Sequence, residues 1–408
     1  MRKKRICLLC CFLAPILYLA FSLYIKIDKI PNTIFIREGQ NITYDYLLKF
    51  SEDDDVKVSN LIDKKETEKK AKVKLLGLLP IKSVSVKAVP SEVMLYPGGQ
   101  PLGVKISTKG VLVVALSDIE TAKGKVTSPG ASSGIQIGDS IIKINKKEIS
   151  SAEQVASLVN SSEGNELAIT IERKGTIINK KVTPIKNDSD NSYKIGLWVR
   201  DSTAGVGTLT FYDAKSQRFA ALGHPITDID TGTILNVSTG QIVSSSIVSV
   251  RKGLRGSPGE LKGIFVDEDS SLGSVSKNTE CGIFGSADKS LINKKYDKPM
   301  KVALRNEIKE GPAKIITTVQ GEEPKAYSIE IQKLLEQDSP GPKSMIIKVT
   351  DSELLEKTGG IVQGMSGSPI IQNDKIVGAV THVLINKPDV GYGIYIEWML
   401  KDADILTK

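Results

Sequence analysis

The sequence predicts a mainly β protein with several folded domains. The chain has 408 residues, of which 40% are hydrophobic, so it can bury two or three separate cores. Aromatic residues make up only 5%, while glycine occurs 35 times among many β-branched residues, and this composition favours strands over helical bundles. In chain order we expect a membrane anchor, a charged connection, a small β-rich module and a C-terminal β domain.

Residues 1–25 have the pattern of a membrane anchor. Four basic residues at positions 2–5 precede an uncharged apolar run over residues 6–25, which is long enough to span a bilayer as a helix. The basic residues predict that the N-terminus stays in the cytoplasm and that the rest of the chain crosses the membrane. A cleaved signal peptide is the alternative, although no clear small-residue cleavage site follows the run.

Residues 26–95 form a charged connection. Residues 52–55 are acidic and residues 64–74 carry mixed charges, with little apolar surface to bury. We expect a mobile tether that is accessible to cleavage, followed by a connecting strand region. The net charge of +8 is spread along the chain without an aromatic, basic face, so a nucleic-acid partner is not predicted. A positive surface close to anionic lipids is the simpler expectation.

Residues 96–188 carry the signature of a PDZ domain. Residues 138–149 are close to the Gly-Asp-x-Ile-x-x-Ile-Asn core of that fold. Val155, Leu158 and Val159 then recur at helical spacing, as expected for the helix that borders a PDZ groove.

The ligand loop of this PDZ domain is predicted near its start. Leu102, Gly103 and Val104 resemble the loop whose backbone amides capture the terminal carboxylate of a peptide, while the peptide adds as a strand. The alternative is a folded spacer that binds no ligand.

A Gly/Ser/Pro turn near the C-terminus supplies the candidate nucleophile. Residues 364–369 read GMSGSP, and the glycines around Ser366 allow a tight turn. The amides of Gly364 and Ser366 would then point into one oxyanion hole. The run resembles the Gly-x-Ser-Gly-x-Pro signature of chymotrypsin-like proteases, and residues 370–383 predict the hairpin that lies beside their nucleophile. The alternative is a plain turn between two strands.

Only two histidines can serve as a general base. His224 follows an apolar strand that closes on a glycine and precedes a proline, so its imidazole is predicted at a strand end, where a cleft can form. His382 lies inside the second strand of the hairpin, and we expect it to be packed or to form part of the cleft wall.

Three carboxylates are candidates for the acid of a catalytic triad. Asp351 ends a strand-like run and opens a helical one, so a helix N-cap is its ordinary role. Asp228 and Asp230, just beyond His224, are alternatives. The triad acid must accept a hydrogen bond from the imidazole, and sequence alone does not test that geometry.

The cysteines give no sign of disulfides or of a metal site. Cys7, Cys10 and Cys11 lie in the apolar run, which leaves Cys281 alone in the rest of the chain. Cys281 has no base nearby in the sequence, so we expect a buried thiol. These residues and two histidines do not make a zinc-ligand set, and no metal or other cofactor is predicted.

Three segments of the C-terminal half resemble one known family. Residues 195–211, the Gly-His-Pro sequence at 223–225 and the turn at 364–369 are similar to the peptidase domain of the stage IV sporulation protein B family. The order of anchor, PDZ domain and peptidase also matches that family, so the resemblance covers nearly the whole chain.

The resemblance implies a chymotrypsin-like double β-barrel serine peptidase over residues 189–408. It also implies a role for each candidate residue: His224 as the general base, Ser366 as the nucleophile and Asp351 as the third member.

The family further implies a biological setting. Its members are secreted by the forespore of endospore-forming bacteria into the space between its two membranes. There they cut themselves and then a membrane-bound regulator of an intramembrane protease. A rival from another class is a catalytically idle, membrane-anchored PDZ scaffold, in which Ser366 is only a turn residue. Trypsin-like quality-control proteases are a weaker rival, because their PDZ domain follows the peptidase.

Overall fold

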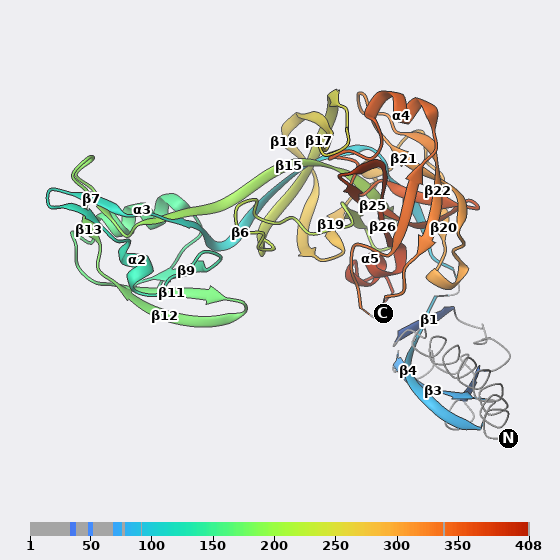
Figure 1. The fold of residues 1–408 in the computed structure, drawn as a ribbon, viewed down its shortest axis with the longest axis horizontal. Coiled ribbons are helices and arrows are strands. Elements are labelled where there is room, and N and C mark those ends of the chain that lie inside the picture. The colour runs from blue at the N-terminus through green and yellow to red at the C-terminus, as the bar shows by residue number, and fades with distance from the viewer. Residues whose placement is uncertain are drawn as a thin grey trace, which may run out of the picture.

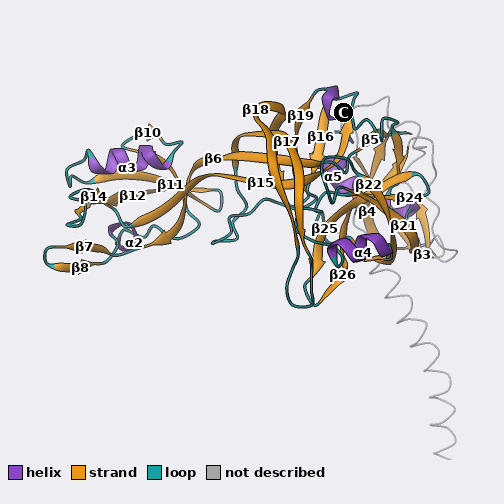
Figure 2. Ribbon diagram, turned by 90° about the horizontal axis from the view of Figure 1, so that it is seen from above, coloured by secondary structure: helices purple, strands orange, loops and turns teal. Residues whose placement is uncertain are grey.

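The computed structural model of the chain describes residues 33–37, 48–51, 68–75, 78–90, 92–337 and 339–406. Strands dominate, as predicted, and the helices are short (Figures 1 and 2). The predicted membrane anchor at residues 1–25 lies outside the described residues. Within the described ranges, no helix combines the length and apolar character needed to cross a membrane.

A small sheet with the order β1-β4-β3-β2 opens the described chain. Its strands are β1 (Thr33–Arg37), β2 (Leu48–Ser51), β3 (Glu68–Leu75) and β4 (Leu79–Val89). In β3, Ala71 and Val73 are buried while Lys70 and Lys72 are exposed, so the lysine-rich stretch alternates as a half-buried strand does. The prediction of a mobile tether is therefore wrong for residues 68–75, and residues 52–67 lie outside the described ranges.

The first barrel of the C-terminal domain is a closed ring of antiparallel strands in the order β6-β15-β16-β19-β18-β17. Its strands are β6 (Pro101–Leu116), β15 (Leu197–Asp213), β16 (Arg218–Ala221), β17 (Val237–Arg251), β18 (Glu260–Thr279) and β19 (Gly282–Ala287). Leu102, Leu209, Phe219 and Ile242 belong to its buried core.

The second barrel closes in the same way, in the order β21-β22-β23-β26-β25-β24. Its strands are β21 (Gly311–Thr317), β22 (Lys325–Leu334), β23 (Met345–Val349), β24 (Pro369–Gln372), β25 (Lys375–Leu384) and β26 (Lys387–Tyr395). Helix α4 (Ser352–Thr358) precedes β24, and α5 (Ile396–Asp402) follows β26. Strand β5 (Met94–Pro97) joins the barrels, because it pairs with β15 and with β20 (Met300–Val302).

The module predicted as a PDZ domain lies apart from the barrels, at the left of Figure 1. Its elements are β7 (Ile119–Thr121), β8 (Gly124–Val126), α2 (Pro129–Ser132), β9 (Ser140–Ile144), β10 (Lys147–Glu148), α3 (Ala152–Asn160), β11 (Leu167–Arg173), β12 (Thr176–Val182), β13 (Ile185–Lys186) and β14 (Tyr193–Lys194). The Ser151 side chain caps α3 by accepting from the Gln154 N–H, and Val155 and Val159 pack into the module's core.

Two long strands connect this module to the first barrel. β6 and β15 pair from Leu116↔Leu197 in the module to Pro101↔Thr208 in the barrel, and Figure 1 shows them as an extended ribbon. The module is therefore an insertion between two neighbouring strands of the first barrel. The predicted PDZ domain begins too early, since the start of β6 already pairs with β17 of the barrel.

The prediction that Leu102, Gly103 and Val104 form the PDZ ligand loop is wrong. All three lie in β6 and pair with β15 on one edge and with β17 on the other. Their backbone groups belong to the sheet ladder and so are not free to capture a carboxylate. The local sequence of residues 102–104 resembles a PDZ loop, but their structure is determined by pairing with strands about a hundred residues downstream.

Candidate active site

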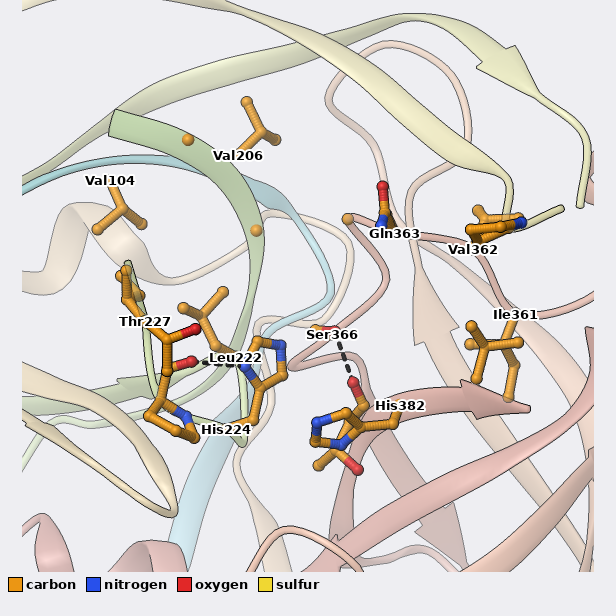
Figure 3. Close-up of a pocket in the computed structure, with 18 of the residues that line it drawn as sticks. Val104, Val206, Leu222, His224, Thr227, Ile361, Val362, Gln363, Ser366 and His382 are labelled. Atoms are coloured by element: carbon orange, nitrogen blue, oxygen red, sulfur yellow. Dashed lines mark hydrogen bonds between the residues drawn. The ribbon is translucent and has the colours of Figure 1, made fainter. Parts of the chain in front are cut away.

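A cavity of ≈ 490 Å³ lies between the two barrels and contains His224, Ser366 and His382 (Figure 3). Its walls come from β6 and β15, from the loop after β16, from the turn before β24 and from the end of β25. The two barrels therefore contribute the two candidate catalytic residues from opposite sides, His224 from the first and Ser366 from the second.

His224 is positioned by a strained turn at the end of β16. Leu222 and Gly223 both have positive φ values, of 70° and 71°, and a left-handed conformation is costly for leucine. The His224 Nδ1 atom lies 2.8 Å from the Pro225 carbonyl oxygen, which can only accept a hydrogen bond, so Nδ1 carries the proton. The other ring nitrogen, Nε2, is left with a free lone pair, and Figure 3 shows that side of the ring facing Ser366.

Ser366 occupies a tight turn whose glycines are required by their surroundings. Gly364 and Gly367 have φ values of 95° and 98°, and a Cβ at Gly367 would lie 2.1 Å from the Thr208 carbonyl oxygen. The Ser366 hydroxyl donates to the Thr381 carbonyl oxygen at 2.8 Å. Among the described residues, the amides of Gly364 and Ser366 donate to no other group, so both are available to an oxyanion.

Two threonines of β15, which the sequence reasoning missed, hold this turn. Thr208 is 2% exposed; its Oγ1 donates to the Gly364 carbonyl oxygen at 2.7 Å and its N–H donates to the Ser366 carbonyl oxygen at 3.1 Å. Thr210 Oγ1 donates to the Gly367 carbonyl oxygen at 2.8 Å. The available signal in the sequence was that threonines alternate with apolar residues in the last part of this strand. A hydroxyl that is buried there needs a hydrogen-bond partner, which points to a structural role.

His382 lies beside the candidate base, as the prediction of a cleft-wall residue requires. The centroids of the His224 and His382 rings are 5.1 Å apart, and the ring planes are tilted by 45°. The Nδ1 atom of His382 is buried without a hydrogen-bond partner in the described structure. Burial, together with the nearby His224 and Lys343, lowers the pKa of His382 to about 4, so this ring is neutral at physiological pH.

The three candidate acids all have partners other than His224. The Asp351 carboxylate caps α4 by accepting from the Leu354 N–H at 3.1 Å, and it also accepts from the Ser328 N–H at 3.2 Å. The buried Asp228 pairs with Arg200, and the exposed Asp230 pairs with the same guanidinium at 2.8 Å. None of the three lines the cavity, so the structure brings together His224 and Ser366 but not the acid that the family resemblance implies.

The single cysteine of the described chain is a buried free thiol, as predicted. Burial raises the pKa of Cys281 well above its ordinary value, so the reactive thiolate does not form at neutral pH.

The pKa of His224 leads to a prediction about pH. Burial lowers it below its ordinary value of about 6.5, and the hydrogen bond to the Pro225 carbonyl opposes this shift only in part. A base with a lowered pKa loses its proton at a lower pH, so kcat/KM is expected to rise with pH with a midpoint below about 6.5. A profile of kcat/KM between pH 4 and 9 on an uncharged peptide tests this, and a midpoint above pH 7 would contradict it.

Comparisons with known proteins agree with this architecture. Residues 191–400 match the SpoIVB peptidase S55 family, and residues 123–173 match a PDZ domain. Among solved structures, the PDZ domain of an SdrC-like protein from Listeria monocytogenes is 17% identical, covering 22% of this chain and 87% of that chain, with a TM-score of 0.18.

Two further solved structures are similar to part of this chain. The active form of the Rv3671c protease from M. tuberculosis is 13% identical, covering 50% of this chain and 75% of that chain, with a TM-score of 0.32. Its inactive form is 12% identical, covering 50% of this chain and 85% of that chain, with a TM-score of 0.29.

Proposed function

Because the chain belongs to the SpoIVB peptidase S55 family, and is a serine peptidase with a PDZ domain, we propose that it cleaves proteins internally with Ser366 as nucleophile and His224 as base. One observation carries the residue assignment. Ser366 and His224 come from different barrels and line one cavity, where the amides of Gly364 and Ser366 donate to no group of the described chain.

The proposed chemistry begins when His224 Nε2 takes the Ser366 hydroxyl proton. The Ser366 oxygen leaves its hydrogen bond to Thr381 and attacks the carbonyl carbon of the scissile bond. The amides of Gly364 and Ser366 stabilise the resulting oxyanion, and His224 returns the proton to the leaving amine. Water, deprotonated by the same imidazole, then releases the acyl-enzyme and restores the serine.

The Pro225 carbonyl takes the orienting role in this proposal. A triad acid holds the imidazole in the tautomer whose Nε2 is unprotonated, and the hydrogen bond from Nδ1 to Pro225 does the same without a charge. A carbonyl stabilises the imidazolium less than a carboxylate does, so the base is correspondingly weaker.

Substitution of Asp351 tests whether the Pro225 carbonyl, and not Asp351, orients His224. Asp351→Asn keeps an N-cap side chain, and we expect kcat/KM within about tenfold of the parent because the residue does not touch His224. Asp351→Ala removes the cap and should lower stability by about 1 kcal/mol. Thermal unfolding and peptide turnover measure the two effects. A loss of roughly 10⁴-fold in a folded Asp351→Asn protein would restore this residue as the triad acid.

We also propose the biological setting that the family implies. The protein cleaves itself and then a membrane-bound regulator of an intramembrane protease during endospore formation, from the space between the two forespore membranes. The support is the family match over residues 191–400 together with the predicted anchor. The PDZ domain holds a peptide end, either of a substrate or of the chain itself.

One experiment separates this function from an idle scaffold. The purified full chain and its Ser366→Ala variant are each divided in two: one half is treated with a fluorophosphonate, the other half is incubated without it, and the masses of all four samples are followed. Labelling of Ser366 and serine-dependent cuts between residues 52 and 97 are expected. Equal, unlabelled and intact masses for both proteins would favour the scaffold.

A further inference from the structure

The catalytic cavity has an unusual lack of charge. Of the described residues that line it, none is Asp, Glu, Lys or Arg, and its two histidines have lowered pKa values. Aliphatic side chains dominate the walls on both sides of Ser366. They include Val104, Val206 and Leu222 from the first barrel and Ile361, Val362 and Val383 from the second.

Two charged residues close to residues of the cavity lining have contacts of their own. Glu260 bridges to Gln363 through its backbone, but its carboxylate pairs with Arg251 at 3.3 Å. Lys343 lies 5.3 Å from the centre of the Tyr392 ring. A charged substrate side chain against the aliphatic walls would therefore lose water without meeting an opposite charge among the described residues that line the cavity.

The end of β25 offers an edge to which an extended peptide can add. Residues His382 and Val383 pair with β26 on one edge, and no described strand pairs with the other edge at this point. Thr381, at the start of this edge, is the residue whose carbonyl accepts from Ser366. A peptide added here as a strand would lie with its scissile bond at the nucleophile and its alternate side chains against the cavity walls.

Ile361 contributes a buried aliphatic side chain to the cavity lining. It is 2% exposed, and its Cδ1 atom lies only 2.6 Å from the position that a Cβ on Gly391 would occupy. Its side chain therefore packs over that glycine, beside the His382 carbonyl oxygen, and adds a buried aliphatic group to the cavity lining.

From these observations we propose that the cleft selects extended segments whose side chains next to the scissile bond are uncharged and aliphatic. This inference rests on the proposed peptidase function and adds the substrate class to it. The chain itself contains two exposed aliphatic side chains of this kind: Leu78, just before β4, is 81% exposed and Leu79, the first residue of β4, is 65% exposed; the β3–β4 pairing would have to open locally for them to enter the cleft. Both leucines fall inside the region where we expect the chain to cut itself.

A peptide series with one varied position tests the proposal. The full chain is given quenched fluorescent peptides that differ only in the residue before the scissile bond, with Leu, Val, Lys, Arg or Glu at that position. We expect kcat/KM to be at least about 100-fold higher for Leu and Val than for the three charged residues, the scale of discrimination that such a site supports. A preference for Lys, Arg or Glu would overturn the proposal.

A designed change at the rim gives the sharper test. Ile385 lines the cavity but is 52% exposed, so a polar side chain is tolerated there. Ile385→Glu should raise kcat/KM for the Lys and Arg peptides at least about tenfold relative to the neutral, equally long Ile385→Gln. Ile264→Glu, at an exposed site outside the cavity, controls for added surface charge. If Ile385→Glu gives no such gain over Ile385→Gln, or if Ile264→Glu gives the same gain, the lack of charge in the cavity is not the cause of the selection.

Failure of the specificity and failure of the function remain distinguishable. Fluorophosphonate labelling of Ser366 with equal cleavage of charged and aliphatic peptides would reject the specificity and keep the peptidase. The absence of both labelling and cleavage would reject the peptidase assignment of Ser366 and the specificity with it. If the parent protein reacts with the fluorophosphonate and, untreated, cuts itself, Leu78→Asp with Leu79→Asp should slow that self-cleavage at least about tenfold, whereas Ile177→Asp, at an exposed site in the PDZ module, should not.

Discussion

Ser366→Ala is expected to lower kcat/KM on an aliphatic peptide by roughly 10⁴- to 10⁶-fold while leaving the fold intact. The substitution removes the attacking oxygen and one hydrogen bond to the Thr381 carbonyl. The turn itself is held from outside by Thr208 and Thr210, whose hydroxyls bond the carbonyls of Gly364 and Gly367. Peptide turnover together with a thermal unfolding curve measures both parts of the prediction.

The double variant with His224→Ala sharpens this result. Since nucleophile and base act as one unit, the double variant should retain about the same residual activity as either single variant. Ser189→Ala, at an exposed serine far along the chain, is the matched control and should keep full activity. If Ser366→Ala kept more than about a tenth of the parent rate, another nucleophile would have to be sought.

Arg305→Met is expected to destabilise the folded chain by about 3–5 kcal/mol at neutral pH, the cost of leaving a buried carboxylate without its partner. The side chain of Glu397, in α5, is only 1% exposed. Its Oε1 lies 2.5 Å from the Arg305 side-chain Nε, and its Oε2 accepts from the Arg305 backbone N–H at 3.1 Å. The guanidinium also lies 4.7 Å from the Trp398 ring centre. Chemical denaturation of the variant and the parent gives the difference.

The pH dependence identifies the cause of this loss. Burial raises the pKa of Glu397 above its ordinary value, and Arg305 opposes that shift, so removing Arg305 raises the pKa further. A folded state that binds a proton more tightly than the unfolded state becomes less stable as pH rises. The deficit of Arg305→Met should therefore be largest at neutral pH and shrink toward pH 4. Arg251→Met breaks the more exposed pair with Glu260 and should cost less than about 1 kcal/mol. A deficit that does not change with pH would instead point to lost packing against Trp398.

The sequence was most informative where chemistry restricts the choice of residue. Ser366 lies between two glycines, and the chain has only two histidines, so the sequence alone identifies the candidate nucleophile and limits the base to two residues. Ser366 and His224 then line one cavity. The buried face of the PDZ helix could also be predicted, because Val155 and Val159 repeat at the period of a helix.

Long-range pairing explains what the sequence did not reveal. Leu102–Val104 resemble a ligand loop locally, but their partners in β15 and β17 lie far along the chain, and no local pattern identifies them. The family resemblance implies that Asp351 is the triad acid, while its position in the sequence also suits a helix cap, and only the fold shows that its oxygens accept from the Leu354 and Ser328 amides. Thr208 was missed because its role depends on a turn more than 150 residues away.

The β6–β15 ribbon also determines how this protein can be divided. A fragment that starts at residue 189, the predicted beginning of the peptidase domain, would keep β15 but lose β5 and β6, leaving the first barrel open along an unpaired edge. By contrast, Lys105 and Ala204 face each other across the ribbon, so a short turn linking its strands near that point would remove the module and preserve the ring. An independent catalytic domain is therefore best obtained by internal excision, and the ring cannot close during synthesis until the whole inserted module has been made.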